Sequence, residues 1–335
     1  MAGYREKAVQ TLAKLPRFRN PEKELKKLNI PVLLPFYHAV SDEPLAYLKH
    51  LYPIKSVQSF REDLEFLLQH FHPIDLAQLN DAIQGKISFK RLPFLMSFDD
   101  GLFNVKEVIA PILRDYGIPA VFFVNSKFTN QEDIFFRYKA SLVVEHLENQ
   151  DTLDSEAMAS FLVDEWHPEQ LKNKILEATY KDRLWLNEVA HLLGLDFDEY
   201  LNRNKLYLDI QDLKELIDQG HAVGAHSVDH PRFEFISEKK QLKQCVKSAK
   251  FIQQHLPQEQ VVFSFPFSDY GVKDSFYQKV LAEIALDNFF GSAGLRPNKG
   301  SLLQRVPMEQ GNLSAAEILS AEIRYLKIKK LLGRV

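Results

Sequence analysis

Two short clusters of polar residues follow apolar stretches of this 335-residue chain. The first is Ser97-Phe98-Asp99-Asp100-Gly101, and the second is His226-Ser227-Val228-Asp229-His230-Pro231. Two histidines four residues apart can face the same side of one helical turn, although this spacing also occurs in ordinary surface or core histidines. A cation held by one carboxylate and two imidazoles would keep coordination positions open for water and substrate. The candidate ligands for a catalytic metal are Asp100, His226 and His230.

Each cluster lies at the end of a predicted strand. The apolar run 94–98 delivers both aspartates to the point where the chain turns, and Gly101 can adopt the backbone angles that such a turn needs. The segment 221–226 is predicted to be a strand that ends at the first histidine. Because α/β folds place their sites at the carboxyl ends of strands, we expect the two clusters to meet.

The rest of the chain alternates apolar strands with amphipathic helices, which predicts an α/β protein with a parallel sheet, open or closed into a barrel. The segment 127–206 differs, because its pattern is helical throughout and no strand is evident, so it is predicted to be a helical insertion. Strands are expected at 31–37, 94–98, 119–124, 221–226, 261–265, near 289 and at 302–306. Helices are expected in 1–27, 60–71, 74–83, 105–116, 209–219, 238–255, 273–284 and 315–332.

Composition excludes several classes of protein. Cys245 is the only cysteine, so an internal disulfide and a zinc site of several thiolates are excluded. The net charge of −3 provides no global basic field for nucleic acid. No signal-peptide pattern or membrane-spanning stretch is evident, which predicts a cytoplasmic protein. Both ends are basic, and they are either solvated helix faces or sites of weak attraction to an anionic membrane.

The two clusters resemble motifs of a known family. Ser97-Phe98-Asp99-Asp100-Gly101 resembles the T/S-F-D-D-G motif of polysaccharide deacetylases, the NodB-homology or carbohydrate esterase 4 family, and 226–231 resembles its H-S/T-x-x-H-P motif. The resemblance covers roughly 31–125 and 207–310. It implies a deformed (β/α) barrel formed by 31–126 and 207–335, with an N-terminal helical extension at 1–30 and the insertion at 127–206. It also implies metal-dependent removal of N-acetyl groups from a polysaccharide, an oligosaccharide or a surface-polysaccharide precursor.

By position, the resemblance assigns roles to individual residues. Asp100, His226 and His230 would bind a divalent metal, with zinc as the first choice, and Asp99 would be the general base. A carboxylate next to a metal ligand can accept the proton of a water that attacks the acetamide carbonyl. The backbone N–H of Phe267 would help to stabilise the resulting oxyanion, because 263–267 resembles the family segment R-x-P-Y/F.

Two departures from the family pattern concern the base and the acid. Ser264 stands where the family has the arginine that orients the base, and no histidine occurs after His255 to protonate the leaving amine. His38 is the candidate acid, since it ends the first predicted strand and Tyr37-His38 resembles an early Y-H pair of some exopolysaccharide deacetylases. It could equally be a core histidine. Glu309 is a second candidate acid if burial raises its pKa, or else a solvated loop residue.

A second function therefore stays open: a deacetylase-fold protein that binds carbohydrate with little or no turnover. Trp166 and Trp185 in the insertion either pack its helices together or stack on a sugar ring. The base retained beside the metal ligands favours the enzyme, because binding alone does not require it.

Overall fold

The computed structural model describes residues 2–149 and 168–334, which divide into two compact units. The first unit consists of 1–42, 54–130 and 207–335, and the second consists of 43–53 and 131–206. The second unit thus corresponds to most of the predicted insertion together with a short segment from the N-terminal part of the chain.

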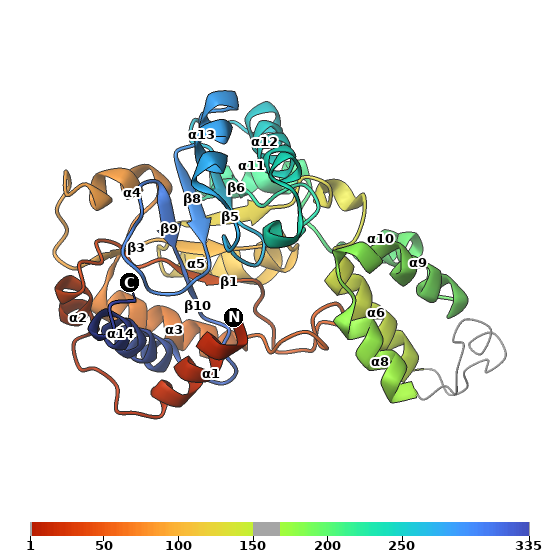
Figure 1. The fold of residues 1–335 in the computed structure, drawn as a ribbon, viewed down its shortest axis with the longest axis horizontal. Coiled ribbons are helices and arrows are strands. Elements are labelled where there is room, and N and C mark those ends of the chain that lie inside the picture. Colours follow the sequence, from red (N-terminus) through yellow and green to blue (C-terminus); the bar gives the residue numbers. More distant parts are fainter. Residues whose placement is uncertain (1, 150–167, 335) are drawn as a thin grey trace. The chain divides into compact units, whose positions relative to one another are not determined.

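The first unit is organised around a sheet of eight strands that are all parallel (Figure 1). The sheet order is β10-β1-β4-β5-β6-β7-β8-β9, so β9 and β10 are its two edges. In the chain these two edge strands are separated by one residue, Arg305. The sheet is therefore a nearly closed barrel, which confirms the predicted deformed (β/α) barrel. Its strands are β1 (Pro35–Tyr37), β4 (Met96–Phe98), β5 (Ala120–Val124), β6 (Ala222–Ala225), β7 (Val262–Ser264), β8 (Asn288–Gly291), β9 (Leu302–Gln304) and β10 (Val306–Pro307). A separate pair is formed by β2 (His72–Pro73) and β3 (Pro93–Phe94).

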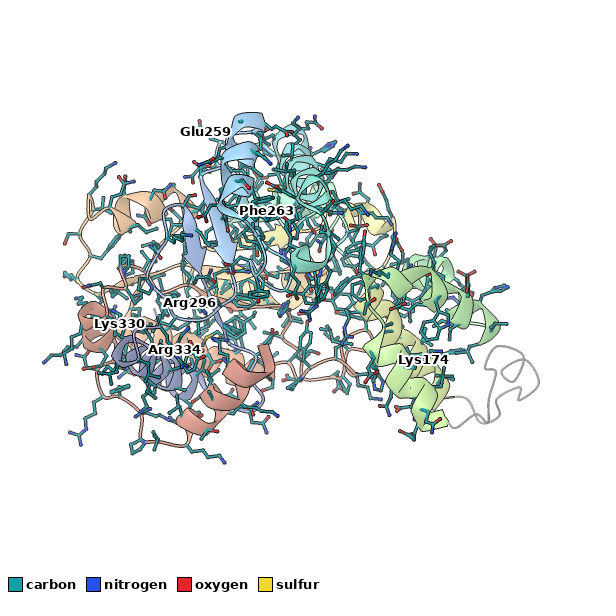
Figure 2. All side chains as sticks on the ribbon, viewed as in Figure 1. Lys174, Glu259, Phe263, Arg296, Lys330 and Arg334 are labelled. Carbon is teal, nitrogen blue, oxygen red and sulfur yellow. The ribbon has the colours of Figure 1, made fainter. Side chains whose placement is uncertain are left out.

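The strands are short and apolar because both faces of the barrel wall are covered. All five residues of β5 are buried, as is typical of a parallel strand between a filled interior and a layer of helices. Phe263 on β7, which Figure 2 labels, is likewise fully buried. For this reason apolar and polar residues do not alternate along these two strands, and continuous apolar runs identify strands of this kind.

The helices of the first unit surround the barrel and follow the predicted ranges within a few residues. They are α1 (Ala2–Ala13), α2 (Pro21–Lys27), α3 (Val57–His70), α4 (Leu76–Ile83), α5 (Ala110–Asp115), α11 (Ile210–Asp218), α12 (Glu238–His255), α13 (Asp274–Glu283) and α14 (Ala315–Leu331). In α3, Phe60, Leu64 and Leu67 recur at helical spacing and are buried, and Ser56 caps the first turn. The predicted helix at 105–116 differs at its start, because Val105–Ile109 is a π-helix.

The described part of the second unit contains helices and no strand, in agreement with the sequence pattern. Its longer helices are α6 (Phe136–Glu148), α8 (Pro168–Glu177), α9 (Arg183–Leu192) and α10 (Phe197–Arg203). The ammonium group of Lys174 on α8 lies 5.1 Å from the ring centroid of Trp185 on α9, so this tryptophan takes part in packing between helices. Trp166 lies outside the described residues.

Candidate metal centre

The two aspartates occupy the turn at the end of β4. Asp99 N–H donates to the carbonyl of Tyr37 at 3.0 Å, which extends the pairing of β4 with β1 by one residue. Asp100 then adopts a left-handed conformation with φ of 73°, followed by Gly101 with φ of 65°. A Cβ on Gly101 would lie 2.9 Å from Val124 Cγ1, so glycine is required for space as well as for conformation. This double turn brings the second carboxylate to the same end of the barrel as the first.

The two histidines converge through a tight turn and not through a helical turn, so the geometric reason expected from their spacing was wrong. Ser227 and His230 have φ of 68° and 58°, and Ser227 Oγ accepts a hydrogen bond from the His230 backbone at 3.0 Å. His226 Nδ1 lies 2.9 Å from the carbonyl oxygen of Ser264, which can only accept. Nδ1 therefore carries the proton, and Nε2 presents its lone pair to the site.

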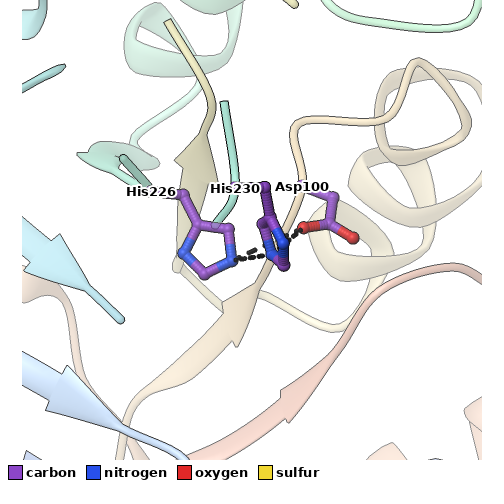
Figure 3. Close-up of side chains that lie close together, drawn as sticks. All are labelled: Asp100, His226 and His230. Carbon is purple, nitrogen blue, oxygen red and sulfur yellow. Dashed lines mark hydrogen bonds and ion pairs between the residues drawn. The ribbon is translucent and has the colours of Figure 1, made fainter. Parts of the chain in front are cut away.

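The three candidate ligand atoms form a small triangle (Figure 3). His226 Nε2 lies 3.1 Å from His230 Nε2, and Asp100 Oδ1 lies 3.4 Å and 3.2 Å from these two nitrogens. A tetrahedral cation with bonds of about 2.1 Å would separate its ligands by about 3.4 Å, so the triangle has the size of one face of such a site. Burial lowers the pKa of His230 and favours the neutral imidazole that binds metals. The residues present therefore fit a divalent cation.

A second group of potential ligands lies in the helical unit but has different surroundings. His50 Nε2 is 2.8 Å from Glu145 Oε2, and Glu148 lies close by. Lys49 is 2.7 Å from Glu145, and Lys172 is 3.2 Å from Glu148. Because two ammonium groups already neutralise these carboxylates, this group does not resemble the buried triangle.

Asp99 is held by Arg305, the residue that connects the two edges of the barrel. Arg305 Nη1 and Nη2 donate to Asp99 Oδ1 and Oδ2 at 2.7 Å and 2.8 Å, a bidentate pair with no solvent exposure on the arginine side. Burial by itself would raise the pKa of Asp99, but the guanidinium charge keeps that pKa below its usual value. Asp99 is therefore ionised at neutral pH.

The surroundings of Arg305 fix its orientation. Its Nη2 donates to Ser264 Oγ at 2.6 Å, and its guanidinium lies 4.4 Å and 5.0 Å from the ring centroids of Phe36 and Phe123. Ser264 thus accepts a hydrogen bond from an arginine that lies between β9 and β10, at the position where the resemblance expected the arginine itself. The sequence analysis missed Arg305. The sequence did contain one indication of this role: Arg305 lies inside the predicted strand at 302–306, and a buried arginine requires a partner for its charge.

His38 and Glu309, considered separately as proton donors, form one pair. His38 Nδ1 lies 2.5 Å from Glu309 Oε2, and the backbone N–H groups of His38 and Ala39 donate to Glu309 Oε1 at 3.0 Å and 3.1 Å. Burial alone would lower the pKa of His38, but the Glu309 carboxylate outweighs it and raises the pKa to about 9. The imidazole is one-quarter exposed and also interacts electrostatically with Asp99 and Asp100. It is therefore a charged group close to the triangle and in reach of solvent.

Comparison with known proteins identifies the family. Residues 89–283, more than half of the chain, match the family model described as polysaccharide deacetylase. The chain belongs to the polysaccharide deacetylase family. This match contains both clusters and the strands β4 to β7 that carry them.

Solved structures agree with this deacetylase fold. Similar structures are the Streptococcus pyogenes deacetylase PplD in complex with acetate (TM-score 0.57) and IcaB from Ammonifex degensii (TM-score 0.54), each 15% identical and covering 87% of this chain and 97% of the other. A de-N-acetylase from Aggregatibacter actinomycetemcomitans has a TM-score of 0.52 at 15% identity and covers 84% of this chain and 96% of its own. At this identity the likeness shows the fold alone. A comparison with curated protein sequences returned no match.

Phe267 lies beside the triangle, in the loop after β7. Its ring meets the ring of His230 edge-on with centroids 4.8 Å apart, and its backbone has a left-handed φ of 58°. Phe263 and Phe265 are buried in the core. Four of the seven described non-glycine residues with positive φ border this site, which is typical of functional loops. They are Asp100, Ser227, His230 and Phe267.

Proposed function

We propose that this chain is a metal-dependent hydrolase that removes N-acetyl groups from an amino-sugar polysaccharide, oligosaccharide or surface-polysaccharide precursor. Membership of the polysaccharide deacetylase family supports carbohydrate deacetylation. The observation that carries the proposal is the position of an ionised carboxylate beside the triangle of ligand atoms: Asp99 Oδ2 lies 3.8 Å from His226 Nε2.

In this proposal Asp100, His226 and His230 hold the cation, and zinc suits a set of two imidazoles and one carboxylate. When bound, the cation lowers the pKa of a water molecule and polarises the acetamide carbonyl. Asp99 accepts the proton as the water oxygen bonds to the carbonyl carbon. Arg305 keeps Asp99 ionised and fixes the direction of its oxygens, so it is a positioning residue.

His38 supplies the proton to the leaving group. With a pKa of about 9 the imidazole is protonated at neutral pH, and Glu309 orients it through Nδ1. Nε2 is then the atom that gives its proton to the amine nitrogen as the C–N bond breaks and acetate forms. The Phe267 N–H donates to the carbonyl oxygen as negative charge develops there. The products are acetate and the free amino sugar.

Acetate release from N-acetylglucosamine oligomers tests this proposal. We expect release by the wild type, loss of release with a chelator, recovery with added zinc, and no release by Asp99→Asn. The alternative, a carbohydrate-binding protein without turnover, predicts that the wild type retains metal and binds the oligomers yet releases no acetate. That result would reject the hydrolase.

We also propose weak attraction to an anionic membrane surface, supported by the charge of the chain's ends. Segments 1–30 and 315–335 contain thirteen Lys and Arg against five Glu, although the whole chain has a net charge of −3. The helices α1 and α2 both pack against α14. Near the end of α14, Lys329 interacts electrostatically with Arg296 and Arg334, two residues that Figure 2 labels, and Leu331 is 87% exposed. Cationic side chains beside an exposed leucine suit anionic lipid.

Sedimentation with lipid vesicles tests this contact. We expect binding to phosphatidylserine vesicles that is lost in high salt and in Lys329→Glu/Lys330→Glu, and no binding to neutral vesicles. Lys239→Glu/Lys240→Glu, a matched change on α12, should bind like the wild type. Equal sedimentation of all variants would contradict the proposal. No described helix is both long enough and apolar enough to cross a membrane.

A further inference from the structure

Two aromatic side chains in the described part of the chain are more than half exposed to solvent. Phe235 and Tyr270 are 67% and 57% exposed, and the other Phe, Tyr and Trp side chains of 5–149 and 168–334 are packed or partly packed. Phe235 lies in the loop between β6 and α12, which also carries His230. Tyr270 lies in the loop between β7 and α13, which also carries Phe267. Both exposed rings thus belong to loops at the carboxyl end of the barrel, and these loops also carry His230 of the metal centre and Phe267, whose ring contacts it.

These two loops pack against each other. A Cβ placed on Gly271 would lie 3.0 Å from Glu234 Cβ and 3.1 Å from Glu234 Cα, and Gly271 has a φ of 78°. The contact therefore needs glycine for both space and conformation. Because Gly271 follows Tyr270 and Glu234 precedes Phe235, the contact places the two exposed aromatic residues on adjoining segments.

The second loop is anchored to the barrel, so Tyr270 is held in place. Asp269 accepts a hydrogen bond from Gln304 of β9 at 3.0 Å, and the Tyr270 backbone N–H donates to Ser268 Oγ at 2.9 Å. The Phe267 carbonyl accepts from the hydroxyl of Ser292. A ring presented on an anchored loop loses little conformational freedom when a ligand binds.

A continuous series of side chains connects the metal centre with these loops. The ring of Phe267 lies against His230, and the guanidinium of Arg232 lies 4.2 Å from the centroid of the Phe267 ring. Arg232 is 44% exposed and forms an ion pair with Glu234 at 3.4 Å. The surface next to His230 therefore carries the guanidinium of Arg232, which can donate hydrogen bonds to hydroxyl or carbonyl oxygens. The exposed ring of Phe235 follows directly after Glu234 in the chain.

We propose that Phe235 and Tyr270 form a stacking platform for sugar rings that neighbour the one being deacetylated. The platform is defined by these two residues. An aromatic face packs on the C–H face of a pyranose, and exposed aromatic area kept beside a reaction centre marks a binding surface. A single amino sugar held at the metal centre would not need it. The inference rests on the proposed function and names two residues that would bind its substrate beyond the reacting sugar.

Kinetics with substrates of two lengths test the platform. We expect the Phe235→Ala/Tyr270→Ala variant to raise KM for the N-acetylglucosamine hexamer by about tenfold, because two stacking contacts are lost. The kcat for the hexamer and both constants for N-acetylglucosamine itself should stay within about twofold, because the monosaccharide has no neighbouring ring to stack. Leu281→Ala, which truncates an exposed apolar residue of α13, is the matched control and should behave like the wild type. Equal effects on monosaccharide and hexamer, or no effect on either, would overturn the platform.

A binding measurement separates failure of the platform from failure of the proposed function. In the Asp99→Asn background, calorimetric titration with the hexamer should give a Kd about tenfold weaker when both aromatic residues are replaced by alanine. An unchanged Kd, or no hexamer binding by the parent protein, overturns the platform whatever the enzyme activity. Absence of acetate release by the wild type, with the expected change in Kd, rejects the hydrolase and keeps the platform as a carbohydrate site.

Discussion

Replacement of Arg305 by methionine removes the charge that holds Asp99 while keeping a side chain of similar length between Phe36 and Phe123. The structure gives Arg305 two hydrogen bonds to Asp99, at 2.7 Å and 2.8 Å, inside a fully buried pair. Loss of one partner of such a pair typically costs about 3–5 kcal/mol of folding stability, because the other charge stays buried. We therefore expect Arg305→Met to fold at low temperature but to unfold at a clearly lower Tm.

The effect on catalysis follows from the pKa of Asp99. Burial raises this pKa and Arg305 is the largest influence that lowers it, so the variant has a higher Asp99 pKa. The base works only when ionised, and activity falls as pH drops through its pKa. The acid limb of the pH–rate profile should thus move to higher pH. A general base typically accelerates a reaction on the order of 10²–10⁴-fold, so kcat at neutral pH should decrease by a factor in that range.

The assay is the pH dependence of acetate release, with metal content and circular dichroism measured on the same samples. Arg324→Met is the matched control, since Arg324 also stacks on an aromatic ring, at 4.5 Å from Phe18, but lies on α14. Ser264→Arg/Arg305→Ser moves the guanidinium to the strand where the family pattern places it. We expect the kcat of this double variant to be at least tenfold higher than that of Arg305→Met.

Two results would refute the reasoning. A folded, metal-loaded Arg305→Met enzyme with an unchanged acid limb and near-normal kcat would show that Asp99 needs no guanidinium. Failure of the relocated arginine to restore activity, in a protein with normal metal content and circular dichroism, would show that position 305 has another role.

Four further predictions concern the metal centre, the base and the proton donor. His226→Ala or His230→Ala should lose most bound zinc in elemental analysis, and normal zinc content would contradict their assignment as ligands. Asp99→Asn should keep the zinc and lose activity by about 10²–10⁴-fold; an active variant would place the base elsewhere. Glu309→Gln removes the carboxylate that raises the pKa of His38, so the basic limb of the kcat profile should move to lower pH, because His38 acts only while protonated. His38→Ala should abolish this limb and lower kcat more than it changes KM, and an unchanged kcat would assign His38 to the core.

The barrel and the convergence of the two clusters could be predicted because they depend on local signals. Continuous apolar runs mark buried parallel strands, and the helical spacing of Phe60, Leu64 and Leu67 marks α3. Asp100 and His226 each follow such a run, and parallel strands end at the same edge. The predicted backbone role of Gly101 agrees with its φ of 65°.

The pairings between distant residues could not be predicted in this way. Arg305 contacts Asp99 across 206 positions of sequence, and Glu309 contacts His38 across 271. Each contact depends on which strands become neighbours when the sheet closes, and apolar periodicity carries no information on that order. The left-handed turn at Ser227 and His230 was missed for another reason, since non-glycine residues adopt such angles when their surroundings impose them.

The position of Arg305 between β9 and β10 makes the charge state of Asp99 dependent on closure of the barrel. A chain whose β9 and β10 had not docked would have Asp99 buried among apolar side chains with no guanidinium beside it, and the carboxyl group would take up a proton. In the proposed mechanism such a chain would have no functioning base. The proposed hydrolase would therefore become active only when its two sheet edges are joined, and partially folded molecules would be inert toward acetylated sugars.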